Sequence, residues 1–237
     1  MIQAGSDCAL AVGFEKMAPG SLGLAFPNMT FPLGKHIEVM NKIAQPSKAP
    51  FACQFFGNAG LEHQEKYGTK DVHFAKIGYK NHKHSVNNPY SQFRDEYTLE
   101  QIQKSTKIFG PLTKLQCCPT SDGAAAAIIV SEKFMKEHKL EDQAVEILGI
   151  ALTTDTESTF AGKSLMAIAG YDMSKAAAEQ VFKKAGKSPK DVQVCELHDC
   201  FSANELITYE ALGLCEPGKA GEFIDKYLKF QINFLTN

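Results

Sequence analysis

Two unbroken apolar runs limit the folds that this chain can adopt. Cys8–Phe14 and Gly123–Val130 contain no charged residue. A short run that is apolar at every position is typical of a strand buried on both faces of a parallel sheet. We expect further strands at Ala144–Leu152 and Val192–Leu197. Because a buried parallel strand needs neighbours and only seven residues precede the first run, we expect the chain to begin inside a domain.

Helical patterns separate these runs. Buried strands that alternate with helices indicate an α/β layered fold, and residues 25–112 are expected to form a helical, loop-rich insertion. Capping signals mark the other expected helix ends. A helix at Gly57–Tyr67 ends at Gly68, and a second helix runs from a Thr69 cap to about Lys80. Thr98-x-x-Gln101 and Ser131 each start a helix, a helix capped by Ser174 ends at Gly186, and Ser202-x-x-Glu205 caps Ala203–Leu212, which ends at Gly213.

The composition excludes several classes of function. The 237 residues are 44% hydrophobic and 22% charged, with a net charge of -2, which is ordinary for a globular protein and gives no general attraction to nucleic acid. No apolar run approaches the roughly 18 residues of a membrane span, and the first residues do not resemble a secretory signal. The seven cysteines lack regular spacing, so we expect reduced thiols, including the adjacent Cys117 and Cys118.

The motif Glu196–Ser202 (ELHDCFS) carries the strongest chemical signal. It places His198 and Cys200 where an extended segment meets a helix, whose N-terminus is electropositive and favours a thiolate and a neutral imidazole. Such a position suits the stabilisation of an oxyanion or an acid/base pair. The alternative is a structural histidine and a buried cysteine, with Asp199 compensating the helix dipole. A Cys–His hydrolase is disfavoured, because the two side chains diverge.

Two further regions contain candidate ligand-binding residues. The polar loop expected at Asn81–Phe93 contains His82, His84 and Asn88, which are either solvated or in contact with a ligand such as a phosphate group. Ser121 precedes the second apolar run, where it either forms a turn or offers a backbone N–H to a ligand. A metal site would require His82 and His84 to share an ion, and no carboxylate stands at ligand spacing.

Several of these segments together resemble a known enzyme family. They are Gly13–Met17, Glu65–Thr69, Lys80–Phe93, Leu115–Ala127 and Glu196–Ser202. In order, they are similar to the sterol carrier protein 2/X-type thiolases, the peroxisomal 3-oxoacyl-CoA thiolases, through about residue 222. The resemblance implies a thiolase-like layered α/β fold of two similar halves, here incomplete. Residues 1–143 would form part of the first half, with the 25–112 insertion, and residues 144–237 part of the second.

The resemblance also implies a chemistry, which is thiolytic cleavage of a 3-oxoacyl-CoA in the oxidation of fatty acids and sterol side chains. Coenzyme A is then a substrate, with no cofactor or metal. His198 would contribute to the oxyanion hole for the thioester, with Asp199, Cys200 and Phe201 as the frame of the motif. Ser121, His82 and Asn88 would border the coenzyme A groove.

The sequence departs from the family in its catalytic motifs. The nucleophilic cysteine and the Gly-His-Pro and Cys-x-Gly motifs have no counterpart here, and Phe223–Asn237 stands as an apolar tail. We therefore expect an inactive fragment of a thiolase, with exposed strand edges and poor solubility. The family implies a homo-oligomer in the peroxisome. The chain ends Leu-Thr-Asn instead of in a peroxisomal signal, which leaves the cytoplasm as the alternative.

Three alternatives remain open at this stage. The first is a non-catalytic module that binds acyl-CoA or a protein partner. The second is a lipid carrier, which the absence of a sterol carrier domain disfavours. The third is a metal hydrolase that uses His82, His84 and His198.

Overall fold

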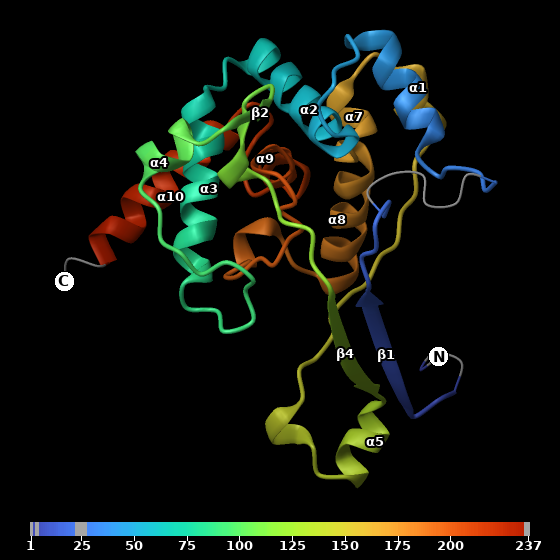
Figure 1. Ribbon diagram of the computed structural model, residues 1–237. Coiled ribbons are helices and arrows are strands. Elements are labelled where there is room, and N and C mark those ends of the chain that lie inside the picture. The colour runs from blue at the N-terminus through green and yellow to red at the C-terminus, as the bar shows by residue number, and fades with distance from the viewer. Residues whose placement is uncertain (1, 3–4, 22–27, 235–237) are drawn as a thin grey trace. The chain divides into compact units, whose positions relative to one another are not determined.

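The computed structural model describes the backbone of residue 2, residues 5–21 and residues 28–234, and their side chains as far as residue 228. It divides the chain into two compact units (Figure 1). The first is drawn from residues 1–30 and 119–148, and the second from residues 31–118 and 149–237. The insertion expected at 25–112 stays a prediction. The boundary between thiolase halves at residues 143 and 144 stays a prediction.

The first unit is built on a two-stranded ribbon. Strand β1, Cys8–Glu15, pairs along its whole length with β4, Gly123–Val130, so both predicted strands are confirmed. The pairing is antiparallel, however, and the expectation of burial on both faces is wrong. Leu10 is 64% exposed and Phe14 80% exposed, because no third strand pairs with this ribbon among the described residues.

Local signals define both ends of the ribbon. At one end, the hydroxyl of Ser131 accepts a hydrogen bond from the Phe134 N–H at 3.1 Å and so caps α5, Glu132–Glu137, as predicted. At the other end, the Asp122 carboxylate accepts hydrogen bonds from the Lys16 ammonium at 2.5 Å and the Met17 N–H at 2.7 Å. A turn of a 3₁₀ helix, Glu141–Gln143, follows in the same unit.

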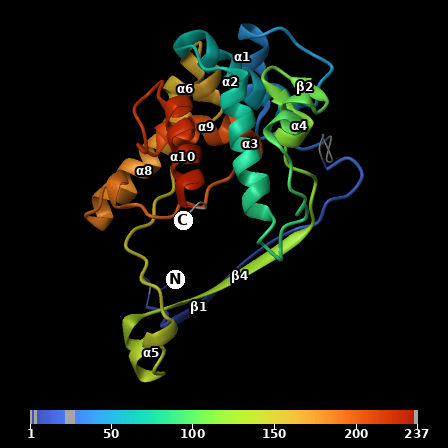
Figure 2. The same ribbon diagram turned by 90° about the vertical axis from the view of Figure 1, so that its left-hand side faces the viewer.

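The second unit is mainly helical (Figures 1 and 2). Helices α2 and α3 both pack against α9, and α10 packs against α3 and α9. The two short strands β2 and β3 form an antiparallel pair near α4. The elements are α1 Gly34–Ile43, α2 Phe51–Tyr67, α3 Asp71–Ser85, α4 Leu99–Lys104, β2 Lys107–Phe109, β3 Leu112–Thr113, α6 Glu157–Ala161, α7 Leu165–Ile168, α8 Tyr171–Ala185, α9 Ser202–Ala211 and α10 Ala220–Phe234, with 3₁₀ turns at Lys114–Gln116 and Pro189–Asp191.

The core of this unit lies between α2, α3, α9 and α10. Its fully buried side chains include Phe74 and Ile77 from α3, Leu206 and Ile207 from α9, and Ile224 from α10. The expectation of an unpaired apolar tail after residue 222 is therefore wrong within the described residues. The tail begins as an amphipathic helix, and Ile224 is completely buried because it packs into the cluster formed with α9.

The predicted helix ends are confirmed where a backbone signal determines them. Gly68 and Gly186 both adopt left-handed conformations, with φ of 72° and 63°, directly after α2 and α8. The Thr98–Gln101 capping box is also present. The Ser174 cap is wrong, because α8 begins at Tyr171 after the left-handed Gly170.

Two predictions about α3 are corrected. Thr69 does not cap the helix, because its hydroxyl lies 2.7 Å from Nδ1 of His63 and the helix begins two residues later. The helix also continues to Ser85, five residues beyond its predicted end. Asn81, His82 and His84 are therefore on a helix, not in a polar loop.

The strands expected at Ala144–Leu152 and Val192–Leu197 are absent among the described residues. Val145 is 90% exposed, Leu152 92% and Val194 82%. Their composition favours strands, but an apolar segment becomes a buried strand only when neighbouring strands pair with it. Within the described residues, no helix is both long and apolar enough to cross a membrane.

Candidate functional site

The candidate site is centred on the turn that leads into α9. The predicted capping box is wrong: Phe201 occupies the cap position without a side-chain bond, and the Ser202 hydroxyl instead donates to Oε1 of Gln116 at 2.8 Å. Phe201 stacks on Phe56, with ring centroids 5.2 Å apart. These contacts fix the start of the helix in the core, from which the preceding residues of the turn emerge.

His198 is exposed at this turn, and its ring makes no hydrogen bond within the described residues. Its backbone carbonyl accepts a hydrogen bond from Nδ2 of Asn204 at 2.6 Å. Two residues later, the carbonyl of Cys200 accepts from the Cys118 N–H at 2.8 Å. The backbone of the turn is thus held on both sides of Asp199, while the imidazole remains accessible to a ligand.

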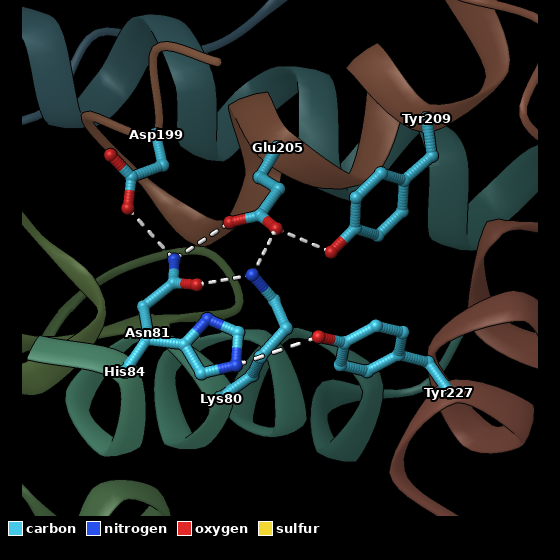
Figure 3. A network of polar contacts seen from close by, with 7 residues as sticks. All are labelled: Lys80, Asn81, His84, Asp199, Glu205, Tyr209 and Tyr227. Carbon is cyan, nitrogen blue, oxygen red and sulfur yellow. Dashed lines mark hydrogen bonds and ion pairs between the residues drawn. The ribbon is translucent and has the colours of Figure 1, made fainter. Parts of the chain in front are cut away.

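A network of polar side chains ties the turn to α3 (Figure 3). The Asn81 amide nitrogen donates to Oδ2 of Asp199 at 2.8 Å and to Oε2 of Glu205 at 2.7 Å. Lys80 contacts the second oxygen of Glu205 at 2.7 Å, and the Tyr209 hydroxyl donates to that same oxygen. Glu205 is only 2% exposed, so these donors replace the water that its carboxylate lacks.

Desolvation raises the pKa values of two groups in the network, Asp199 and Tyr209. Partial desolvation and, next, repulsion by Glu205 raise the pKa of Asp199 above its ordinary value. Burial is also the main cause of the raised pKa of Tyr209, which the Glu205 charge raises further. Tyr209 therefore stays a hydrogen-bond donor to Glu205 at neutral pH.

Cys200 does not have the thiolate character expected for a thiol at a helix N-terminus. It is 7% exposed, and burial raises its pKa to about 12. Burial likewise raises the pKa of each of the other cysteines in the second unit, namely Cys53, Cys117, Cys118, Cys195 and Cys215. At neutral pH these six thiols remain protonated, so desolvation outweighs the helix dipole at Cys200.

The other candidate residues make contacts that do not involve the side chain of His198. The His82 ring lies 2.9 Å from the carbonyl oxygen of Leu115 and packs edge-on against Tyr97, and His84 lies 3.5 Å from the Tyr227 hydroxyl. Asn88 caps a local turn by accepting from the Tyr90 N–H at 3.0 Å. No group of three or more potential metal ligands exists among the described residues, so the three histidines of the metal hypothesis do not gather.

Ser121 belongs to the first unit, two residues before β4. Asp122 and Gly123 follow it, and Asp122 closes the ribbon through Lys16 as described above. The backbone at Ser121 and Asp122 forms no turn, so the turn expectation is not confirmed. A contact between Ser121 and coenzyme A stays a prediction.

The second unit also has a groove of about 620 Å³ that does not include His198. Its lining is mostly apolar, and α3, α4, α10 and the segment before α4 contribute to it. The lining residues are Lys76, Tyr79, Lys83, Glu96, Tyr97, Thr98, Leu99, Gln101, Asp225 and Leu228. Its size is in the range of small-molecule sites.

The sequence motifs do not indicate Asn81 or Glu205 as members of the site. Asn81 and Glu205 are 124 residues apart in the chain, so no local spacing connects them. One signal was present: a glutamate, Glu205, lies on a largely apolar helix three residues after Ser202. A buried charge on such a helix requires a partner from elsewhere.

The helices around the His-Asp-Cys-Phe turn define a thiolase-like protein. Residues 154–229 match the family model "Thiolase C-terminal domain-like". The structure is similar to that of a protein titled "Ltp2-ChsH2(DUF35) aldolase", with a TM-score of 0.74 and 21% identity, over 95% of this chain and 56% of that one. A second similar structure is that of a "monomeric SCP2-thiolase like protein type 1 (STLP1) from Mycobacterium smegmatis", with a TM-score of 0.62 and 19% identity, over 90% of this chain and 43% of that one. At these identities the likeness shows the fold alone, and it confirms the predicted thiolase-like α/β fold.

The sequence identifies the family more narrowly. The chain is 58% identical to "Sterol carrier protein 2" of Rattus norvegicus over 95% of this chain and 42% of the relative. It is 51% identical to "Non-specific lipid-transfer protein-like 2" of Caenorhabditis elegans over 93% of this chain and 55% of the relative. The predicted resemblance to the sterol carrier protein 2 type of thiolase-like proteins is thus confirmed, and the chain spans about half the length of these relatives or less.

Proposed function

We propose that this polypeptide binds a 3-oxoacyl-CoA thioester through the α9 turn, with the His198 imidazole donating a hydrogen bond to the thioester carbonyl. The family reaction is acyl transfer between such thioesters and coenzyme A. The observation that supports the proposal is the exposed ring of His198 on a turn whose backbone is held by Asn204 and Cys118. A donor held in place where a carbonyl oxygen can develop charge is the basis of an oxyanion hole.

We further propose that this chain does not turn the thioester over. Acyl transfer by a thiolase needs a cysteine thiolate as the nucleophile. The six cysteines of the second unit all have pKa values raised by burial, so the unit that contains His198 offers no thiolate beside it. Binding with a single oxyanion donor would leave little of the rate acceleration.

Calorimetric titration of the chain with acetoacetyl-CoA and with coenzyme A tests the binding proposal. The wild-type chain is expected to bind the thioester more tightly, and His198→Ala to remove this preference, a loss of about three- to tenfold, which corresponds to one hydrogen bond. His138→Ala is the matched control, because it deletes an exposed imidazole of the first unit that stacks on Phe134. Equal preferences in the wild type and in His198→Ala would refute the role of His198.

The same samples test the absence of turnover. The concentration of acetoacetyl-CoA in the presence of coenzyme A is followed over time by absorbance. We expect no loss above the rate without protein. Thiolysis that His198→Ala abolishes would show instead that the chain is an active enzyme.

A second candidate function is the binding of a lipid without coenzyme A. The groove beside α4 supports it, because Tyr79, Tyr97, Leu99 and Leu228 give it a mostly apolar wall. Titration with a fluorescent fatty acid distinguishes the two functions. Lipid binding that coenzyme A does not displace and His198→Ala does not change would favour this candidate. A peroxisomal location and assembly into a homo-oligomer are further proposals, and they rest on the family alone.

A further inference from the structure

The amide of Asn81 has no spare hydrogen-bonding N–H. One amide carries two N–H donors, and they are used by Asp199 at 2.8 Å and Glu205 at 2.7 Å. Its oxygen accepts from the Lys80 ammonium at 2.5 Å. With both donors and the acceptor engaged, the orientation of the amide is determined by its partners.

The two acceptors of this amide differ in mobility. Glu205 is buried and is also held by Lys80 and Tyr209, so it is fixed to the core of the unit. Asp199 is exposed, and its carboxylate is held by the hydrogen bond from Asn81 and by one from its own backbone N–H. The amide therefore connects a rigid group on α9 to a side chain on the accessible turn (Figure 3).

From this arrangement we infer that Asn81 is a positioning residue for His198, an inference that rests on the proposed function of the turn. Asp199 directly follows His198, and its carboxylate is tied to α3. The tie restricts the rotation of the turn between the two backbone bonds made by the His198 and Cys200 carbonyls. A displacement of about 1 Å in a reacting or binding group is enough to lose much of its effect.

The first experiment measures ligand preference. Asn81→Ala is expected to lose the preference for acetoacetyl-CoA over coenzyme A by about three- to tenfold, as His198→Ala does. In the His198→Ala background, Asn81→Ala is expected to cause no further loss of preference, because it acts through the imidazole. Additive losses would overturn the inference.

The same unit contains a pair of residues that serves as a matched control. The Gln64 amide donates to Oδ1 of Asp71 at 2.7 Å, so Gln64→Ala also deletes a hydrogen bond between an amide and a carboxylate. This pair joins the end of α2 to the start of α3 and has no contact with the turn. Gln64→Ala is expected to keep the ligand preference of the wild type. A loss equal to that of Asn81→Ala would show that the effect is not specific to the turn.

The second experiment needs no ligand. Hydrogen exchange of the peptide that covers residues 198–203 is measured by mass spectrometry, and Asn81→Ala is expected to exchange about tenfold faster, as a charge-assisted hydrogen bond is lost. Asp199→Ala, at an exposed position, deletes the other partner and is expected to match it. Unchanged exchange in both variants would overturn the inference.

These experiments separate two kinds of failure. A wild-type chain that does not prefer the thioester contradicts the proposed function, and the exchange data still decide whether Asn81 holds the turn. A wild-type preference that survives Asn81→Ala contradicts the positioning role alone.

Discussion

Substitution of Glu210 by alanine is expected to destabilise the second unit more than most single changes. Its side chain is 1% exposed on α9, and Oε1 accepts from Nε2 of His63 at 2.9 Å and from the Ala220 N–H at 3.0 Å. The Gly218 N–H also donates to it. One carboxylate thus joins α2 and α9 to the first residue of α10.

The size of this loss in stability follows from the buried N–H donors that have no acceptor after the substitution. A buried donor without a partner costs about 1–3 kcal/mol, and the substitution removes the acceptor of the His63, Gly218 and Ala220 N–H groups. Because water can reach part of the space left by the side chain, we expect Glu210→Ala to lower the free energy of unfolding by about 3–5 kcal/mol. Glu210→Gln keeps an acceptor of the same shape, so a loss of about 1–2 kcal/mol is expected.

The charge of Glu210 also predicts a dependence on pH. Burial raises the pKa of Glu210, but the hydrogen bonds from His63, Gly218 and Ala220, together with attraction to His63, outweigh burial and hold the pKa below its ordinary value of about 4.5. The ionised carboxylate therefore stabilises the folded state fully above that pH. The contribution fades as the pH falls through the lower, folded-state pKa.

Urea unfolding followed by the helical circular dichroism signal measures these effects for the wild type and both variants. The difference in unfolding free energy between the wild type and Glu210→Gln should be constant above about pH 5. It should become smaller in more acidic solution, because Gln does not titrate. A gap that widens as the pH falls, or a Glu210→Ala variant within 0.5 kcal/mol of the wild type (about the effect of an ordinary surface change), would refute the reasoning.

Three further predictions concern packing, thiol reactivity and solubility. Gly57→Ala would place a Cβ 2.6 Å from the Phe109 ring, and this overpacking is expected to lower the free energy of unfolding by about 1–3 kcal/mol. An unchanged urea midpoint would contradict the overpacking. At neutral pH, exposed Cys8 should be alkylated well before buried Cys200, whose pKa is about 12, as peptide mass spectrometry can show; the reverse order would contradict the burial. Val12→Lys, at a position 60% exposed on the ribbon, should reduce aggregation in light scattering, and equal scattering would show that this strand does not drive association.

The sequence predicted those features that adjacent residues determine. A glycine that adopts a left-handed conformation ends a helix whatever lies around it, as at Gly68 and Gly186. Ser131 satisfies an N–H three residues away, and the apolar run at Gly123–Val130 coincides with β4. The identification of the family depended on motifs of the same local kind.

The features that were predicted wrongly depend on a partner elsewhere in the chain. Ser202 resembles a cap, but its hydroxyl donates to Gln116, which is 86 residues away. Thr69 is used by His63 instead of by α3. The apolar segments after residues 144 and 192 have the composition of strands, yet a strand also requires a paired edge, which composition cannot supply.

The candidate site combines both kinds of information. The motif supplied the imidazole, because His198 and the start of α9 are neighbours in sequence. The rigidity of the turn comes from α3, more than a hundred residues earlier, through Asn81 and Glu205. Since a buried carboxylate must find donors, Glu205 was the residue from which such a partner could have been sought. A family motif can therefore name the group that contacts a ligand, while the residues that hold it in place are found only in the folded structure.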